Sequence, residues 1–274
     1  MEAFIILAFF SALCIVAYYQ LRQPSNRGPW AIEHAVAPYA TFEGERITIH
    51  NVRTFDYYST KSHRIRYESR VYDLSKLKHM DYILEDFMQG NNTGHVFISF
   101  GFENGIYIAF SIEARRRPGQ EFSAYVGLLK RYELIYIASD EHDVLKLRAV
   151  HRNDDVRVYP IKATTEDARR VFISIIERMN KLRTNPEFYN SISNACGTNL
   201  FAHLRLIYPK LSLRRFPAIF LVTSDAYLLT QGVFDTDLSI HEARSHFLVN
   251  KKAHEHKDEE DFSLRIRTTV PHTP

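Results

Sequence analysis

Cysteine is nearly absent from this chain of 274 residues, which contains only Cys14 and Cys196. Cys14 lies in an apolar N-terminal stretch and is a poor disulfide partner, so we expect no disulfide framework. A formal net charge of only +3 and the lack of an RNA- or DNA-binding motif argue against nucleic acid as a partner. The sequence also lacks a glycine-rich phosphate loop, a paired-carboxylate glycosidase signature and internal repeats. Only ten glycines accompany 16 tyrosines and 19 phenylalanines, which indicates aromatic-rich strands.

The length suits one sizeable domain with an anchor, and two small domains are the less favoured alternative. With 45% apolar and 24% charged residues, the composition is that of a folded protein. We predict a membrane anchor over residues 1–22, an irregular proline-containing linker over 23–40, and a single domain over 41–270.

The predicted anchor is an apolar run. Residues 3–19 carry no charge, and as a helix they would span roughly 25 Å, at the short end for crossing a bilayer. Tyr18, Tyr19 and Arg22 would mark its interface. A cleaved signal peptide is the alternative, but no Lys or Arg precedes the run and no small-x-small cleavage site follows it. We therefore predict an uncleaved single-pass helix; by charge alone, Arg22 and Arg27 would keep the rest of the chain cytoplasmic.

Hydrophobic periodicity predicts a mixture of strands and helices. We expect a long loop over 54–66 and strands over 46–53, 67–72, 81–86, 132–138, 143–150 and 155–161. The strongest helical pattern begins after Thr164, an expected N-cap with Asp167 three residues on, and ends at Asn185 before a proline. A second helix is expected from Cys196, or the residue after it, to Ile207.

Residues 95–114 form the clearest local structure, a hairpin. Glu103-Asn104-Gly105 separates two alternating runs, as in a three-residue loop with glycine in the left-handed conformation. Such a loop pairs residues whose numbers sum to 208 and leaves one face wholly apolar. A two-residue loop would place Glu113 opposite Val96 on that apolar face, so the pattern favours the first register. In this register His95 and Glu113 are cross-strand neighbours, with Cβ atoms about 5 Å apart.

Cys196, His95 and Glu113 are the candidate catalytic residues. A thiol at a helix start meets unpaired N–H groups and the positive end of the helix dipole, which favour the thiolate and can bind an oxyanion. Glu113 would hold the His95 tautomer and stabilise the imidazolium. Room for the Cys196 helix is expected over the small side chains on the His95 face, namely Ser99, Ala109 and Ser111. The residues alone leave two other interpretations open, a small buried thiol and a solvated His–Glu pair.

Other histidines are weaker candidates. His203 lies two helical turns after Cys196, too far along the axis to act as its base. Four histidines near the C-terminus lack a supporting cluster of Cys or Asp, so we expect neither a metal nor a cofactor; they are His241, His246, His254 and His256.

Several segments, taken in order, resemble the Lnb N-terminal periplasmic domain family. They are Ile49 to Arg53, Phe55-Asp56-Tyr57, Tyr72-Asp73-Leu74, His95 to Phe102, Ser111 to Arg116, Tyr132 to Tyr136, Glu187 to Asn190, the run around Cys196, and Asp261 to Arg267. The likeness extends from about Trp30 to Ile266. It implies an α+β, permuted papain-like (NlpC-type) fold, with an antiparallel sheet packed on helices and the histidine strand ahead of the cysteine helix.

The resemblance also implies roles. Cys196 would be the nucleophile, His95 the general base and then acid, and Glu113 its orienting group. Ala195 and Gly197 stand where the family usually has Asn and Thr, so we expect no oxyanion or substrate contact from those two side chains. The family's namesake is a lipoprotein N-acyltransferase, and its periplasmic placement is preferred here over the orientation that charge alone suggests.

Three functions are compatible with these features. The leading hypothesis is a thiol acyltransferase or acyl hydrolase, anchored in the bacterial inner membrane through residues 3–19, with its domain in the periplasm and a lipid or lipoprotein as its acyl substrate. The second is a papain-type cysteine peptidase or amidase that acts on cell-wall peptides. The third is a non-catalytic envelope module.

Overall fold

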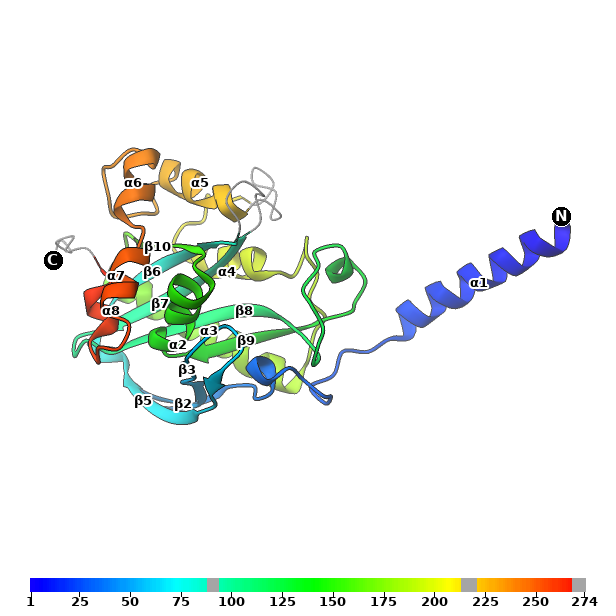
Figure 1. Ribbon diagram of the computed structural model, residues 1–274, viewed down its shortest axis with the longest axis horizontal. Coiled ribbons are helices and arrows are strands. Elements are labelled where there is room, and N and C mark those ends of the chain that lie inside the picture. Colours follow the sequence, from blue (N-terminus) through cyan, green and yellow to red (C-terminus); the bar gives the residue numbers. More distant parts are fainter. Residues whose placement is uncertain (88–93, 213–220, 268–274) are drawn as a thin grey trace.

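The computed structural model describes residues 1–87, 94–212 and 221–267 (Figure 1). The strands are β1 (Tyr39–Glu43), β2 (Arg46–Arg53), β3 (Asp56–Tyr57), β4 (His63–Arg64), β5 (Tyr67–Asp73), β6 (Leu77–Asp86), β7 (Gly94–Phe102), β8 (Tyr107–Arg115), β9 (Glu133–Ser139) and β10 (Asp155–Pro160). The helices are α1 (Glu2–Leu21), α2 (Glu141–Lys146), the π-helical η4 (Leu147–Arg152), α3 (Thr165–Thr184), α4 (Cys196–Leu204), α5 (Ser224–Thr230), α6 (Ile240–His246), α7 (Asn250–Glu255) and α8 (Phe262–Arg265).

One sheet organises the α+β domain. Its strand order is β1-β2-β9-β8-β7-β6-β10, with β5 also paired to β2. All pairings in this sheet are antiparallel except that of β2 with β9, which is parallel and joins Arg53 to Ser139. The prediction of an α+β chain with a mainly antiparallel sheet is therefore confirmed.

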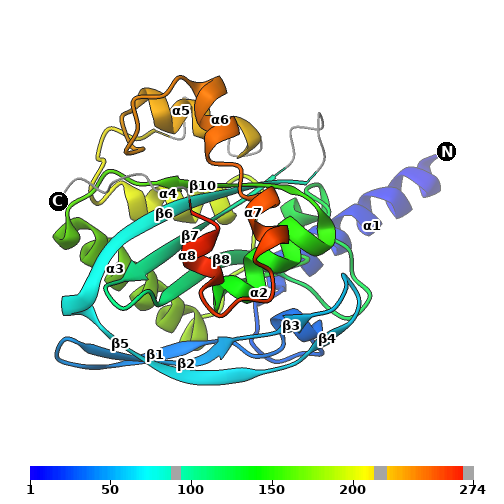
Figure 2. The same ribbon diagram turned by 60° about the vertical axis from the view of Figure 1, so that its left-hand side comes forward.

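Two layers of helix cover the sheet. Helices α3 and α4 pack on one face, where Phe172 of α3 is fully buried and its ring meets those of Phe100 and Phe110 edge-on at 5.0 and 5.6 Å. On the opposite face, Val144 of α2 and Phe262 of α8 share a second core with Phe97. Figure 2 shows α2, α7 and α8 lying in front of the sheet. Both faces of the central strands are thus buried.

The hairpin has the predicted register. Phe97 pairs with Ser111 and Gly101 with Tyr107, which is the pairing in which residue numbers sum to 208. Gly105 has a φ of +74°, the left-handed conformation that the three-residue loop requires, and its N–H donates to the carbonyl of Phe102. A side chain at position 105 would strain this turn, because residues other than glycine rarely adopt this φ.

Most predicted elements are confirmed, but residues 143–150 are not a strand. They belong to α2 and η4, which begin where the Asp140 side chain accepts a hydrogen bond from the His142 N–H. Nearly every residue of this segment is buried, so its apolar pattern has no helical stripe to distinguish it from a buried strand. Three further boundaries differ. The strand predicted over 81–86 starts at Leu77, the helix predicted to end at Ile207 ends at Leu204, and the loop predicted over 54–66 contains the short pair β3 and β4.

The N-terminal helix α1 leads away from the domain (Figure 1). Among the described residues, no helix combines the length and the apolar character that crossing a bilayer requires, so the transmembrane helix predicted over 3–19 is not confirmed.

Candidate active site

Cys196 is the first residue of α4, as the sequence predicts, and its side chain is buried. The helix is held against the sheet by three side chains with no exposed surface, Leu200, Phe201 and Leu204. The turn before it is fixed by polar contacts: the Ala195 N–H donates to Thr198 Oγ1 at 2.7 Å, and Asn199 Nδ2 donates to Asn194 Oδ1 at 2.9 Å. The thiol is therefore held at the N-terminal end of the helix, where unpaired N–H groups gather.

His95 and Glu113 are neighbours across the β7–β8 hairpin. His95 Nε2 lies 3.3 Å from Glu113 Oε1 and 2.7 Å from Ser111 Oγ, which itself donates to Glu113 Oε1 at 2.6 Å. The imidazole also stacks on the Phe97 ring, with centroids 5.6 Å apart. These contacts fix the ring plane and occupy Nε2, which leaves Nδ1 as the nitrogen available to another partner.

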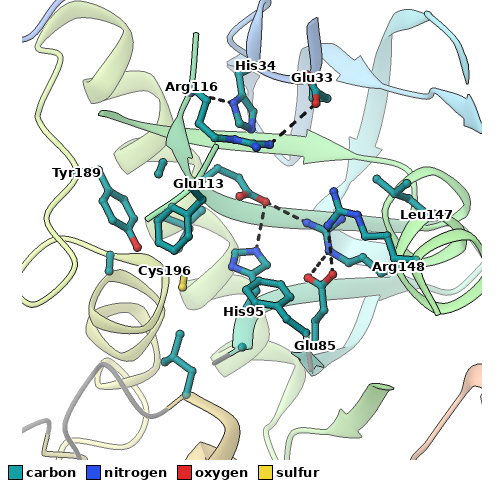
Figure 3. A pocket seen from close by; sticks show the side chains of 18 of the residues that line it. Glu33, His34, Glu85, His95, Glu113, Arg116, Leu147, Arg148, Tyr189 and Cys196 are labelled. Atoms are coloured by element: carbon teal, nitrogen blue, oxygen red, sulfur yellow. Dashed lines mark hydrogen bonds and ion pairs between the residues drawn. The ribbon is translucent and has the colours of Figure 1, made fainter. Parts of the chain in front are cut away.

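That other partner is Cys196. The Cys196 thiol lies close enough to His95 to influence the pKa of the imidazole, and both residues line one cavity (Figure 3). The structure thus brings all three predicted site residues together: the thiol lies beside the imidazole, and the imidazole contacts the carboxylate. A solvated His–Glu pair does not describe this arrangement, because His95 is buried; Cys196 is buried as well, as the alternative of a small buried thiol also predicts.

The route by which the helix reaches the histidine differs from the prediction. We expected α4 to approach over Ser99, Ala109 and Ser111, but that face is covered by α2 and η4, and Ser99 Oγ donates to Glu141 Oε1. Helix α4 instead packs on the apolar face. Because His95 lies at the beginning of β7 and Cys196 at the beginning of α4, the two side chains meet at the end of the sheet.

The electrostatics favour a charged imidazole. Burial alone lowers the pKa of His95, but the negative charge of Glu113, followed by the influence of Cys196, outweighs it and raises the pKa to about 10. Burial raises the pKa of Glu113, yet the charges of His95 and Arg148 hold it well below its usual range. The result is an ion pair between His95 and Glu113 at neutral pH.

Arg148 is a site residue that the sequence did not reveal. From η4 its Nη2 contacts Glu113 Oε1 at 3.0 Å, and its Nε donates to Glu85 Oε2 at 2.7 Å. Its guanidinium also lies over the Phe97 ring at 5.1 Å. The sequence pattern of residues 143–150 predicts a strand, which gives no reason to place this arginine beside Glu113. Its position completes a chain of charged side chains from Glu85 through Arg148 and Glu113 to His95 (Figure 3).

The three residues open onto a cavity of about 540 Å³. Beside Cys196 its lining is mainly apolar and comes from Ile112, Ala114, Phe122, Ala124, Tyr189 and Leu221. Beyond Glu113 the lining is mainly polar and includes one aliphatic side chain, Leu147; its polar members are Glu33, His34, Arg53, Tyr57, Glu85, Arg116, Arg148 and Arg152. Burial lowers the pKa of His34 to about 4 despite the nearby charge of Glu113, so this second imidazole is neutral. A ligand with an apolar chain and a polar head fits such a lining.

The remaining histidines lie in other surroundings. His203 is buried and forms hydrogen bonds with Tyr136 Oη at 2.9 Å and Ser174 Oγ at 2.8 Å, and burial lowers its pKa to about 4. Across residues 1–87, 94–212 and 221–267, no three His, Cys, Asp or Glu side chains are grouped so as to hold a metal ion.

Comparison with known families gives one result. The family described as the Lnb N-terminal periplasmic domain matches residues 64–226, a range that contains His95, Glu113 and Cys196. The segments around Ile49 and Asp261 that also resemble this family lie outside the matched range. No curated protein and no solved structure matches the chain.

Proposed function

The chain belongs to the Lnb N-terminal periplasmic domain family, and on this premise we propose that it is a periplasmic thiol enzyme that transfers or hydrolyses acyl groups. The observation that carries the proposal is that a buried thiol at a helix start lines the same cavity as an imidazole that a carboxylate holds. The mainly apolar lining beside the thiol supports a lipid or lipoprotein as the acyl donor.

The first step forms a thioester. The thiolate of Cys196 attacks the carbonyl carbon of an ester or amide, and backbone N–H groups in the first turn of α4 stabilise the oxyanion. With a pKa of about 10, His95 is protonated at neutral pH and enters the reaction as the acid. It gives its proton to the departing oxygen or nitrogen as the carbon–sulfur bond forms and the original acyl bond breaks.

The second step releases the acyl group. An amine or water attacks the thioester, His95 takes the proton of the attacking group, and the carbon–sulfur bond breaks to return the thiolate. An amine acceptor makes the enzyme a transferase, and water makes it a hydrolase. Glu113 and Arg148 keep the imidazole in place through both steps.

We also propose that the domain is a permuted papain-like fold. Three features support this: the cysteine begins a helix, the histidine and its carboxylate lie on adjacent antiparallel strands, and the strands precede the helix in the chain. The side-chain arrangement matches the chemistry of that class, in which one ring nitrogen faces the thiol and the other is held by a polar partner.

Mass spectrometry of the intact protein tests the proposed function. Purified full-length chain is incubated with a diacylated lipopeptide or with muropeptides, and both the protein and the products are weighed. We expect an acyl adduct on Cys196 with the lipopeptide, present in Cys14→Ser and absent in Cys196→Ala. Cleavage of muropeptides, with no fatty acyl adduct from the lipopeptide, would instead indicate a peptidase or amidase. Failure of both substrates, with Cys196→Ala unchanged from the parent, would leave a non-catalytic module.

A further inference from the structure

Large apolar side chains gather on the surface beside the cavity. Four belong to the segment between β8 and β9 and one to the loop before α4; they are Phe122, Tyr125, Leu128, Leu129 and Ile192, here called the apolar rim. Tyr125 is 84% exposed and Ile192 54% exposed. Clusters of this kind on a protein surface commonly mark a contact with another molecule or with a membrane.

The two segments of the apolar rim are fixed to one another. Ser191 Oγ donates to the carbonyl of Ala124 at 2.7 Å, and a Cβ atom at Gly127 would collide with Ser191 Oγ. The Phe122 ring stacks on Tyr132 at 5.9 Å and meets Tyr189 edge-on at 6.0 Å. These contacts hold the two segments that carry the exposed side chains in a fixed position relative to one another.

The apolar rim is continuous with the cavity that contains the thiol. Phe122 belongs to both, and its neighbours Ala124 and Tyr189 line the cavity together with Cys196. An apolar chain that entered the cavity from the rim would therefore contact apolar side chains that line the cavity with Cys196.

Cations and a further apolar surface lie next to the rim. Lys130 Nζ donates to the carbonyl of Tyr19 at the end of α1, and both Lys130 and Arg22 lie over the Phe188 ring, at 5.7 and 5.4 Å. Several apolar side chains of α1 are exposed, among them Phe4 at 77%. Figure 1 shows α1 leaving the domain on the side of the segment between β8 and β9. Apolar groups flanked by lysine and arginine suit a bilayer with anionic headgroups.

We infer that the apolar rim is a docking surface for an anionic lipid bilayer, and that it delivers a fatty acyl chain from the bilayer into the cavity at Cys196. The delivery of the chain rests on the proposed function, whereas the docking does not. The occupant is a membrane surface because the rim combines exposed aromatic and aliphatic groups with adjacent cations and opens onto an apolar cavity.

Tryptophan quenching by brominated lipids tests the docking. Trp30 is the only tryptophan, so full-length Trp30→Phe/Tyr125→Trp carries a single fluorophore on the rim. The matched control is Trp30→Phe/Tyr58→Trp, because Tyr58 is 63% exposed and lies outside the rim, at the end of β3. Each protein is mixed with vesicles of phosphatidylglycerol and phosphatidylcholine whose acyl chains carry bromine, and circular dichroism verifies that both are folded.

We expect at least a twofold loss of fluorescence at position 125 and less than a tenth at position 58. Bromine quenches tryptophan fluorescence only at short range, so membrane binding through α1 alone would leave the tryptophan unquenched at both positions. Equal quenching at the two positions, or quenching at neither, would overturn the proposed docking surface. Self-association of the chain in the absence of vesicles would then identify a second copy of the chain as the partner that covers the rim. The same measurement in a Cys196→Ala background separates docking from the proposed function, because that variant cannot form a thioester.

Discussion

His95 and Arg148 contact the same oxygen of Glu113. His95 Nε2 lies 3.3 Å and Arg148 Nη2 3.0 Å from Glu113 Oε1, and both cations are buried. The Glu113 carboxylate therefore favours the charged form of the His95 imidazole, and the Arg148 guanidinium holds that carboxylate in place. Glu113 thus links Arg148 to the imidazole beside the thiol.

The variant Glu113→Gln removes the charge that raises the pKa of His95 to about 10. The pKa of His95 then falls, so less imidazolium is present at pH 8 and the alkaline limb of the activity profile moves to lower pH. We expect the rate of thioester formation, the step in which His95 acts as the acid, to fall at pH 8 by about 10²-fold or more. An alkaline limb that stays in place would contradict the assignment of Glu113. Asp140→Asn, a change in a carboxylate outside the cavity lining, is the control.

The same ion pair makes stability depend on pH. Because the pKa of folded His95 is raised to about 10, its contribution is complete below about pH 6.5 and is lost as the pH rises towards 10. Glu113 has the opposite sign, with a lowered pKa and a contribution that is lost in acid. We expect the free energy of unfolding in urea to fall between pH 6.5 and 10, and to fall less in Glu113→Gln. Parallel curves for the two proteins would show that the pair does not titrate in this way.

Arg148→Met tests the buried network. The change removes the 2.7 Å ion pair of Glu85, whose side chain has no exposed surface, and leaves it the longer ion pair with Arg152 at 3.4 Å. Removing one partner of a buried ion pair typically costs about 3–5 kcal/mol, and we expect a loss of that order in denaturant unfolding. Arg170→Met, at a side chain 52% exposed, should cost at most about 1 kcal/mol. Similar losses for the two variants would mean that Arg148 is not a structural partner.

Phe172→Ala tests the hydrophobic core in which α3 and α4 pack against the sheet. The Phe172 side chain is fully buried between the hairpin and α3, so its truncation should cost about 3–5 kcal/mol in denaturant unfolding. Phe42→Ala is the control, since Phe42 is 45% exposed and should lose about 0.5 kcal/mol or less. A loss at Phe172 no larger than at Phe42 would refute the description of this core.

Local patterns predicted the parts of the site that local forces determine. The hairpin register followed from one apolar face and a loop that ends in Gly105, and that register alone brought His95 beside Glu113. The start of α4 at Cys196 and the N-cap of α3 at Thr164 were likewise readable, because capping depends on a few adjacent residues.

Long-range packing could not be predicted from local sequence patterns in the same way. The buried run at 143–150 had no periodicity that separates helix from strand, so Arg148 could not be placed beside Glu113. The side of the sheet on which α4 packs was predicted wrongly, since small residues such as Ser99 indicated space that α2 fills. The polar side of the cavity, including His34, combines side chains from segments that are distant in the sequence, so no sequence motif predicts it.

Alkylation of Cys196 by iodoacetamide tests the central claim most directly. In a Cys14→Ser background the chain has a single thiol, and the rate is measured from pH 5 to 9 with and without His95→Ala. We predict that His95→Ala slows alkylation at pH 6 by at least about tenfold, because the thiolate loses its imidazolium partner while access to the sulfur becomes wider. Cys14, measured in Cys196→Ala, should be indifferent to His95→Ala. Equal rates at Cys196 with and without the imidazole would contradict a coupled thiol, imidazole and carboxylate.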